Sequence, residues 1–322
     1  MYGREDCHPY NPVTVTRYAP AVLVAALLAA TGYAFLHTES LKLETSPISQ
    51  TRVTKTFSPV CRCDSSRARF AFRLAKPDVL SVSIVDGSGS DVRRLATDSP
   101  GRERVAFLWN GRDDGGRVVA DGAYRARVRL DLQEQTFVLP NLIRVDTKRP
   151  GLDLVSVRPR VFSPDGDRRS DRITVGYRVA EPARVRLSVD GVQRVVGASL
   201  LPTGELEWYG KVAGASLPAR RYALALEAVD RAGNRSLPVS AGSVRIRYVE
   251  LAAPVLRAKA GGVLRVRLLT DARRVSWRLG KRAGVGKAPL LRLRAPQKAG
   301  RYRLVVAVNG HQARAFVVVT AS

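Results

Sequence analysis

Cysteine and histidine are scarce in this sequence, which has three of each among 322 residues. Structural zinc sites, iron–sulfur clusters and histidine-based catalytic centres draw their ligands and bases from these residue types. So few of them in a chain of this length argue against all three kinds of site. The sequence therefore predicts no cofactor.

Sequence motifs of catalysis are missing as well. The chain has no G-x-S-x-G, no H-E-x-x-H and no P-loop. His8, His37 and His311 have no nucleophile partner in a recognisable motif. Carboxylates are plentiful, but whether two of them lie at catalytic distance is not readable from sequence. We expect a protein that is not an enzyme.

Acidic residues are outnumbered almost two to one, because 54 Lys and Arg face 28 Asp and Glu, for a formal net charge of +26. Only nine of the basic residues are Lys. This bias toward Arg, with abundant Ala, Val and Gly, is typical of a genome rich in G and C, so part of the charge is compositional. With 45% hydrophobic residues, the chain has the composition of folded domains, and its length allows two or three.

Long apolar runs are absent except for one, residues 18–36, which contains no formal charge. As a helix it would span about 28 Å, close to the roughly 30 Å hydrocarbon core of a bilayer. The alternative is a cleaved signal peptide whose apolar region is residues 19–30. Arg4 and Arg17 precede the run and Lys42 follows it, which favours a cytoplasmic N-terminus.

This run sets the expected location of the chain. We predict a cytoplasmic tail at residues 1–17, a transmembrane helix (or signal peptide) at 18–36 and a polar tether at 37–52. The bulk of the chain then lies outside the bacterial cytoplasmic membrane, either attached to it as a single-pass protein or secreted after signal cleavage.

Most of the remaining chain is predicted to form strands in which apolar and polar residues alternate. In residues 124–132 the even positions are apolar and the odd positions charged, which indicates a strand with one dry and one wet face. Residues 80–84, 185–189 and 222–228 repeat the pattern. Short strands separated by Gly, Pro, Asn and Asp predict an all-β fold of antiparallel sandwiches, with no amphipathic helix after residue 37.

An internal repeat divides this β region. Ser58-Pro59 matches Ser163-Pro164, and residues 72–77 match residues 177–182 at the same offset, with a looser third copy from about Ala252. Repeats of this length are domain duplications. We predict domains at residues 53–149, 150–250 and 251–322, the last one strongly basic.

A longer motif carries a family resemblance. The segment from Trp109 to Tyr124 contains every fixed position of W-x-G-x-D-x-x-G-x-x-(V/L)-x-x-G-x-Y: Trp109, Gly111, Asp113, Gly116, Val119, Gly122 and Tyr124. It resembles the immunoglobulin-like domain of the flagellar hook-capping protein family, and the second repeat retains Trp208, Gly210 and Tyr222. The resemblance implies tandem immunoglobulin-like sandwiches, without implying a role in flagellar assembly.

The motif predicts a structural role for several of its residues. Trp109 and Tyr124 are expected to bury large rings on two strands. Asp114-Gly115 and Asp121-Gly122 are expected to form turns in which Gly takes a positive φ.

Two small clusters are weaker site candidates. Asp165, Asp167 and Asp171 form a D-x-D-x-x-x-D loop that is a weak Ca²⁺ candidate, since short Asp side chains also cap their own turns. Cys61 and Cys63 form a C-x-C pair; a strand would hold their Cα atoms about 6.6 Å apart, at the outer limit for a disulfide. An internal or intermolecular disulfide is favoured over a metal site. Cys7 is expected to be a free thiol without a functional role.

The third domain carries the main functional expectation. Residues 252–322 contain sixteen Lys and Arg and one acid, Asp271. If the strand faces that hold its Arg pairs adjoin, they form a basic surface that binds polyanions by Coulomb attraction and counterion release. The alternative is a solvated surface produced by codon bias. The predicted polyanion-binding residues are Arg265, Arg267, Arg273, Arg274, Arg292, Arg294, Arg301 and Arg303.

The sequence thus favours a membrane-anchored, non-catalytic surface protein whose stalk presents a basic domain to anionic envelope material. Nucleic acid is a less favoured ligand, because only Trp277 and Tyr302 accompany the Arg pairs. Two alternatives remain at this stage. The first is a protein interaction or assembly module that pairs through strand edges, and the second is an accessory subunit of a wall-modifying enzyme.

Overall fold

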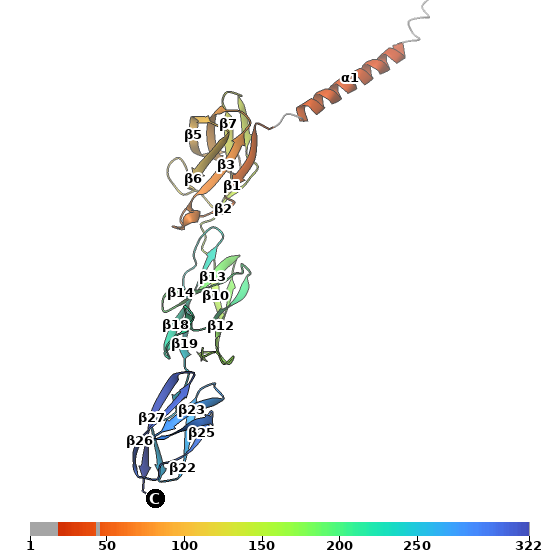
Figure 1. The fold of residues 1–322 in the computed structure, drawn as a ribbon. Helices are drawn as coiled ribbons and strands as arrows, with labels where there is room; N and C mark the ends of the chain where they lie inside the picture. Colours follow the sequence, from red (N-terminus) through yellow and green to blue (C-terminus); the bar gives the residue numbers. More distant parts are fainter. Residues whose placement is uncertain (1–18, 43–45, 322) are drawn as a thin grey trace, which may run out of the picture.

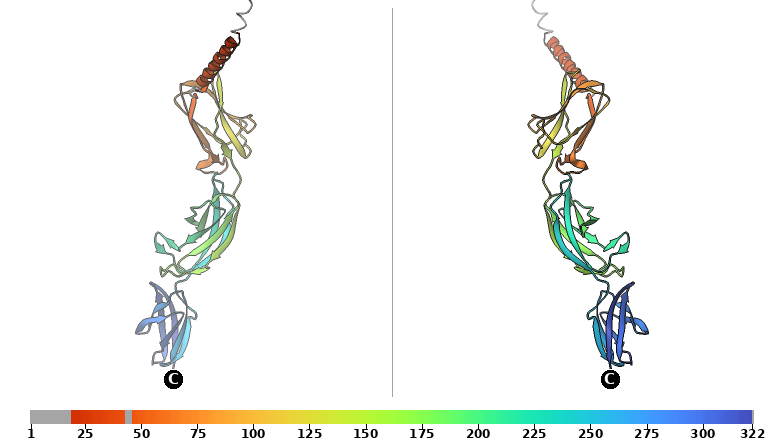
Figure 2. Two further views of the ribbon diagram at one scale, coloured as in Figure 1. Left: turned by 90° about the vertical axis from the view of Figure 1, so that its right-hand side faces the viewer. Right: turned by 90° about the vertical axis from the view of Figure 1, so that its left-hand side faces the viewer.

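The computed structural model describes residues 19–42 and 46–321. A helix is followed by three β-sandwiches arranged end to end, and the C-terminus lies at the end of the row farthest from the helix (Figure 1). Figure 2 shows the same row of domains from two further directions. The predicted cytoplasmic tail, with Cys7 and His8, lies outside the described residues.

The helix α1 (Ala19–Lys42) extends past the predicted end at Leu36, since no Pro or Gly interrupts residues 33–42. Every described side chain in it, from Pro20 to Leu36, is exposed. Among the described residues, no helix combines the length and apolarity that crossing a membrane requires. The predicted span begins at Tyr18, outside the described residues, so the transmembrane helix stays a prediction.

Domain 1 (residues 48–145) packs a three-stranded sheet, β1-β3-β6, against a larger sheet, β2-β9-β7-β4-β5, with β8 paired to β7. A short 3₁₀ helix, η1 (Asp64–Ser66), follows β2. The strands are β1 (Ile48–Val53), β2 (Thr56–Phe57), β3 (Ala68–Leu74), β4 (Asp78–Val85), β5 (Asp91–Gly101), β6 (Arg104–Trp109), β7 (Gly122–Leu130), β8 (Gln135–Val138) and β9 (Ile143–Val145).

Two strand predictions in domain 1 need correction. The predicted tether, residues 37–52, is helical up to Lys42 and enters β1 at Ile48, because Ile48 is buried and β1 pairs with β3. The strand predicted to reach Leu132 ends at Leu130, and Leu132 is 72% exposed in the turn that follows. Within β7 the expected alternation holds, with Tyr124 and Val128 buried.

Domain 2 (residues 152–246) repeats this layout in the sheets β10-β12-β15 and β11-β19-β18-β13-β14, with a small β16-β17 hairpin. Its strands are β10 (Leu152–Arg158), β11 (Val161–Phe162), β12 (Ile173–Val179), β13 (Ala183–Val189), β14 (Val192–Val196), β15 (Thr203–Trp208), β16 (Lys211–Val212), β17 (Ala215–Ser216), β18 (Arg221–Asp230) and β19 (Val239–Ile246).

Domain 3 (residues 250–320) has the sheets β20-β22-β25 and β21-β27-β26-β23-β24. Its strands are β20 (Glu250–Leu251), β21 (Val255–Lys259), β22 (Val263–Leu269), β23 (Arg274–Leu279), β24 (Arg282–Lys287), β25 (Leu290–Arg294), β26 (Gly300–Val308) and β27 (His311–Thr320).

All three domains therefore share one topology. Each has a three-stranded sheet facing a larger one, and each contains one parallel pair, β2–β9, β11–β19 or β21–β27. The buried residues form three separate hydrophobic clusters, one per domain. The architecture is an all-β row of immunoglobulin-like sandwiches, and it includes the third domain, whose sequence matches the others only by general pattern.

Candidate functional site

The residues of the family motif build the cores of domains 1 and 2. Trp109 is fully buried and meets Tyr124 edge to face, with ring centroids 5.1 Å apart. Trp208 meets Tyr222 in the same way at 5.8 Å. The Tyr124 hydroxyl donates to the Ala120 carbonyl. These aromatic residues therefore stabilise the fold, and their role is structural.

The motif glycines have different roles from those expected. Gly111 and Gly116 take positive φ, at 68° and 80°, whereas Gly115 and Gly122 do not. The expectation for Gly115 and Gly122 is therefore wrong: the left-handed residue of the first turn is Gly116, and Gly122 begins β7 as ordinary strand. Asp113 closes the first turn by accepting the Arg117 N–H at 2.8 Å.

Cys61 and Cys63 form a disulfide in a loop of domain 1, with Cα atoms 5.3 Å apart. The pair lies in a turn, not along a strand, and Arg62 between them has a φ of 50°. A Cβ on Gly233 of domain 2 would lie 2.5 Å from the Cys63 sulfur. The disulfide loop therefore packs against the β18–β19 turn at the junction of the first two domains.

The predicted polyanion-binding arginines fall into three groups. Arg265 and Arg267 on β22, with Arg292 and Arg294 on β25, point away from the core of domain 3, where Leu264, Val266, Leu291 and Leu293 alternate with them. We call these four arginines, on the outer face of the sheet β20-β22-β25, the basic face. Arg265 lies directly opposite Arg292 in the ladder.

The other four arginines lie elsewhere. Arg301 and Arg303 are exposed on β26, in the opposite sheet, and the Arg301 guanidinium lies 3.8 Å from the centre of the Phe316 ring. Arg273 lies between β22 and β23, and Arg274 begins β23. The expected single surface is thus divided, because β22 and β26 belong to different sheets of the sandwich.

The equivalent face of domain 2 has the opposite charge pattern on one strand. There β15 exposes Glu205 and Glu207 around the buried Leu206, where β25 exposes Arg292 and Arg294 around the buried Leu293. Both glutamates are paired, Glu205 with Arg158 at 3.3 Å and Glu207 with Arg172 at 2.9 Å. On this face of domain 2, arginines therefore balance the charges of both glutamates.

The corresponding face of domain 1 is a shallow open groove lined by Arg52, Arg69, Arg73 and Arg104 among other residues. Arg73 forms an ion pair with Glu103 beside it. Within residues 46–321, by contrast, none of the four arginines of the basic face pairs with an acid. Within the same residues, Arg52, Arg69 and Arg104 of domain 1 form no ion pair either, so domain 3 differs from domain 1 in that all four of its arginines on this face are unpaired.

Asp165, Asp167 and Asp171 do come together in the structure. One carboxylate oxygen from each lies within 4.8 Å of the others. The backbone N–H groups of Gly166 and Arg168 both donate to Asp171, at 2.7 Å each, so this carboxylate also holds the loop in shape. The turn-capping interpretation is therefore confirmed for Asp171, and the calcium site stays a prediction.

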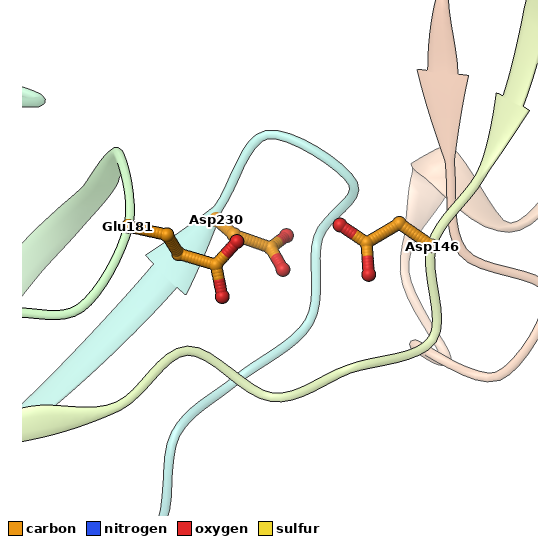
Figure 3. Close-up of side chains that lie close together, drawn as sticks. All are labelled: Asp146, Glu181 and Asp230. Atoms are coloured by element: carbon orange, nitrogen blue, oxygen red, sulfur yellow. The ribbon is translucent and has the colours of Figure 1, made fainter. Parts of the chain in front are cut away.

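A second acidic cluster was missed from the sequence. Asp146, Glu181 and Asp230 converge where domain 1 meets domain 2, with Asp146 approaching from the domain 1 side (Figure 3). Burial and the charges of Asp146 and Asp230 raise the pKa of Glu181. The three residues lie on three separate segments of the chain, so no local motif could have revealed the cluster.

His311 is accounted for by packing. Its ring stacks on Tyr248 with centroids 3.4 Å apart, at the start of β27. The side chain of His37 and all of His8 lie outside the described residues.

No protein-family model matches the chain, and no curated protein matches it in sequence. Solved structures align with it at low identity. They include the fibronectin(III)-like modules of Clostridium thermocellum CbhA, with 15% identity and a TM-score of 0.35 over 61% of this chain and 93% of that chain. An I-band fragment of titin aligns at 12% identity and a TM-score of 0.30, over 86% and 99% of the two chains.

A structure of a 1.5-MDa bacterial ice-binding adhesin aligns at 13% identity and a TM-score of 0.28, over 87% of this chain and 100% of that chain. The immunoglobulin-like fold is assigned from the strand order and core of this chain itself. The likeness to the hook-capping protein family stays a resemblance carried by one motif.

Proposed function

We propose that this chain is a non-catalytic, membrane-anchored surface protein in which domains 1 and 2 form a stalk and domain 3 binds anionic polymer of the cell envelope. The observation that supports this most is the charge reversal between equivalent strands. Codon bias acts on all three domains, yet domain 2 carries Glu205 and Glu207 where domain 3 carries Arg292 and Arg294. A biased genome alone does not account for that difference.

The electrostatics of the basic face favour a ligand. Arg265 and Arg292 are directly opposite each other, and like charges in that arrangement destabilise a sheet. No acid offsets the repulsion, so a bound polyanion would relieve it while releasing counterions. The exposed neighbours on this face are aliphatic, Val263, Leu269 and Leu290, which gives little support to stacking on single-stranded nucleic acid.

Matched charge deletions test the proposal. The full chain in mild detergent is titrated against fluorescent inorganic polyphosphate. Arg265→Ser with Arg292→Ser should weaken binding by roughly tenfold, since each lost exposed contact contributes up to about 1 kcal/mol. Arg301→Ser with Arg303→Ser removes the same charge from the opposite sheet and should weaken it by less than about threefold. Equal losses in the two variants would show that net charge, and not the basic face, governs binding.

The anchor is part of the same proposal. Large apolar side chains of α1 such as Leu23, Leu28 and Leu36 are 63%, 69% and 70% exposed, and a helix that is apolar on all sides is stable only in an apolar surrounding. We expect the full chain to stay with bacterial membranes after an alkaline wash. A chain that begins at residue 46 should appear in the supernatant. Recovery of the full chain from the soluble fraction would rule out the anchor.

A protein partner is the second candidate function. In domain 2, β14 is the free edge of its sheet and exposes Val192 and Val196, which are 50% and 45% exposed. An extended partner segment can add to such an edge. Binding to envelope extract that survives high salt would favour this candidate over a polyanion.

A further inference from the structure

The junction between domains 2 and 3 brings together two loops that are far apart in sequence. Residues 163–171 of domain 2 meet Asp271, which lies between β22 and β23 of domain 3. Arg169 donates across the junction to the Asp271 carbonyl at 3.3 Å. The Asn309 amide of domain 3 donates to the Asp165 carbonyl at 3.2 Å. Each domain therefore donates a side-chain hydrogen bond to a backbone carbonyl of the other across this junction.

Several oxygen atoms in this junction are buried without a hydrogen-bond partner. They are both carboxylate oxygens of Asp271, Oδ2 of Asp165 and the hydroxyl of Ser163. Ser163 is only 1% exposed. Burial raises the pKa of both Asp165 and Asp271, and the nearby Ser163 hydroxyl offsets only part of that rise. The hydroxyl itself makes no well-formed hydrogen bond to either carboxylate. A buried oxygen without a partner destabilises a fold unless another group satisfies it.

The charge of the junction is unbalanced. Burial, together with the negative charges of Asp165 and Asp167, raises the pKa of Asp271 to about 6. The chain carries 45 Arg, yet within its described part none of Asp165, Asp167, Asp171 or Asp271 forms an ion pair. Asp271 is moreover the single acid among residues 252–322. Asp165, Asp167 and Asp171 thus lie within 4.8 Å of one another, and the charges of Asp165 and Asp167 also act on Asp271 from across the junction. The nearby Arg169 guanidinium binds the Asp271 carbonyl and pairs with none of the four carboxylates.

We propose that Asp165, Asp167, Asp171 and Asp271 bind a calcium ion that joins domain 3 to domain 2, with the Ser163 hydroxyl facing the ion. All the available donors are oxygens, which hard cations prefer, and no cysteine or histidine takes part. Ca²⁺ accepts six to eight oxygens in flexible geometry, whereas Mg²⁺ requires a near-ideal octahedron. Ligands drawn from a loop and from a neighbouring domain suit calcium better.

The acidic cluster at the junction of domains 1 and 2 provides an internal contrast. There Asp230 is satisfied by protein groups, because it accepts the Gly233 N–H at 2.7 Å and the Asn234 N–H and side-chain amide at 2.9 Å each. None of its oxygens, nor those of Asp146 and Glu181, is buried without a partner. We therefore assign no ion to this cluster and use Glu181→Gln as the matched control.

Calcium titration of the full chain in mild detergent tests the site. By calorimetry, the wild type should bind one Ca²⁺ with a dissociation constant between about 1 µM and 1 mM, the range of sensor and extracellular calcium sites. Asp271→Asn should weaken binding at least tenfold, and Glu181→Gln should leave it within about twofold. Asp167→Asn, at an exposed position, serves as a second test should Asp271→Asn fold poorly.

Thermal unfolding supplies a second readout. In chelator, Asp271→Asn should melt at a higher temperature than the wild type, since it removes a buried carboxylate without a partner. In calcium the order should reverse, because only the wild type gains stability from the ion. Absence of calcium binding by the wild type, or equal affinities of the wild type and Asp271→Asn, would overturn the proposal. The basic face lies on a different part of domain 3, so its failure to bind polyphosphate would leave the calcium result unaffected.

Discussion

At the scale of single residues, the three domains share one side-chain hydrogen bond. The hydroxyl of a tyrosine near the start of an inner strand donates to the carbonyl four residues earlier: Tyr124 to Ala120, Tyr222 to Pro218 and Tyr302 to Lys298, at 2.7, 2.8 and 2.9 Å. Such a tyrosine corner is typical of immunoglobulin-like domains. It relates domain 3 to the other two more directly than the family motif, of which domain 3 lacks the tryptophan.

Replacing Asp78 tests how much a single buried side chain contributes to the stability of domain 1. It is 4% exposed and accepts hydrogen bonds at 2.9 Å from the Leu132 N–H and the Gln133 amide, which fix the turn after β7. Asp78→Ala removes both and should destabilise domain 1 by about 1–3 kcal/mol. Urea unfolding followed by hydrogen exchange in β7 measures this, and unchanged protection of β7 would contradict it.

The same residue predicts a pH dependence. Burial raises the pKa of Asp78, but the hydrogen bonds from Leu132 and Gln133 outweigh burial and leave the pKa below its ordinary value. Folding therefore favours the ionised carboxylate. Its contribution should be complete above about pH 4 and should be lost as the pH falls through the folded-state pKa. The stability difference between the wild type and Asp78→Ala should shrink in that acid range.

At the scale of strands and turns, the sequence periodicity predicts which side of a strand is buried, but it does not predict which strands pair with each other. The alternation in residues 124–130, 183–189 and 263–269 identifies the buried face of each strand, because one side must meet the core. It does not say which sheet a strand joins, so the Arg pairs of β22 and β26 were expected on one surface and lie on two. Asp165, Asp167 and Asp171 could be grouped from the sequence because one loop holds them, but Asp271 could not be added to them, since about a hundred residues separate it from Asp171.

Two motif glycines that look alike in sequence should respond differently to a methyl group. At Gly111, φ is 68° and a Cβ would lie 2.8 Å from Pro59, so Gly111→Ala should destabilise domain 1 by about 1–3 kcal/mol. At Gly122 a Cβ would meet nothing closer than the Tyr124 ring at 3.9 Å, so Gly122→Ala should change stability by less than about 0.5 kcal/mol. Thermal unfolding of both variants compares them directly, and similar losses would refute the distinction.

At the scale of the whole molecule, an Asn side chain bridges each of the two junctions. Each Asn lies in the last hairpin turn of its domain and donates to a backbone carbonyl of an earlier part of the chain. Asn234 binds Asp146, in the segment after β9, at 3.0 Å, and Asn309 binds Asp165, in the loop after β11, at 3.2 Å. Tyr248, 1% exposed, adds a stack on His311 and receives a bond from Thr270 at its carbonyl. These contacts hold the row of domains seen in Figure 1, with domain 3 farthest from the helix.

The salt dependence of polyphosphate binding by the full chain tests the central claim most directly. If the four arginines of the basic face engage the polymer, the logarithm of affinity should fall with the logarithm of salt concentration with a slope near −3, at about 0.7 per contact. Arg265→Ser with Arg292→Ser should reduce the magnitude of that slope by about 1.4. A slope near zero for the wild type, or an unchanged slope in the double variant, would contradict the account.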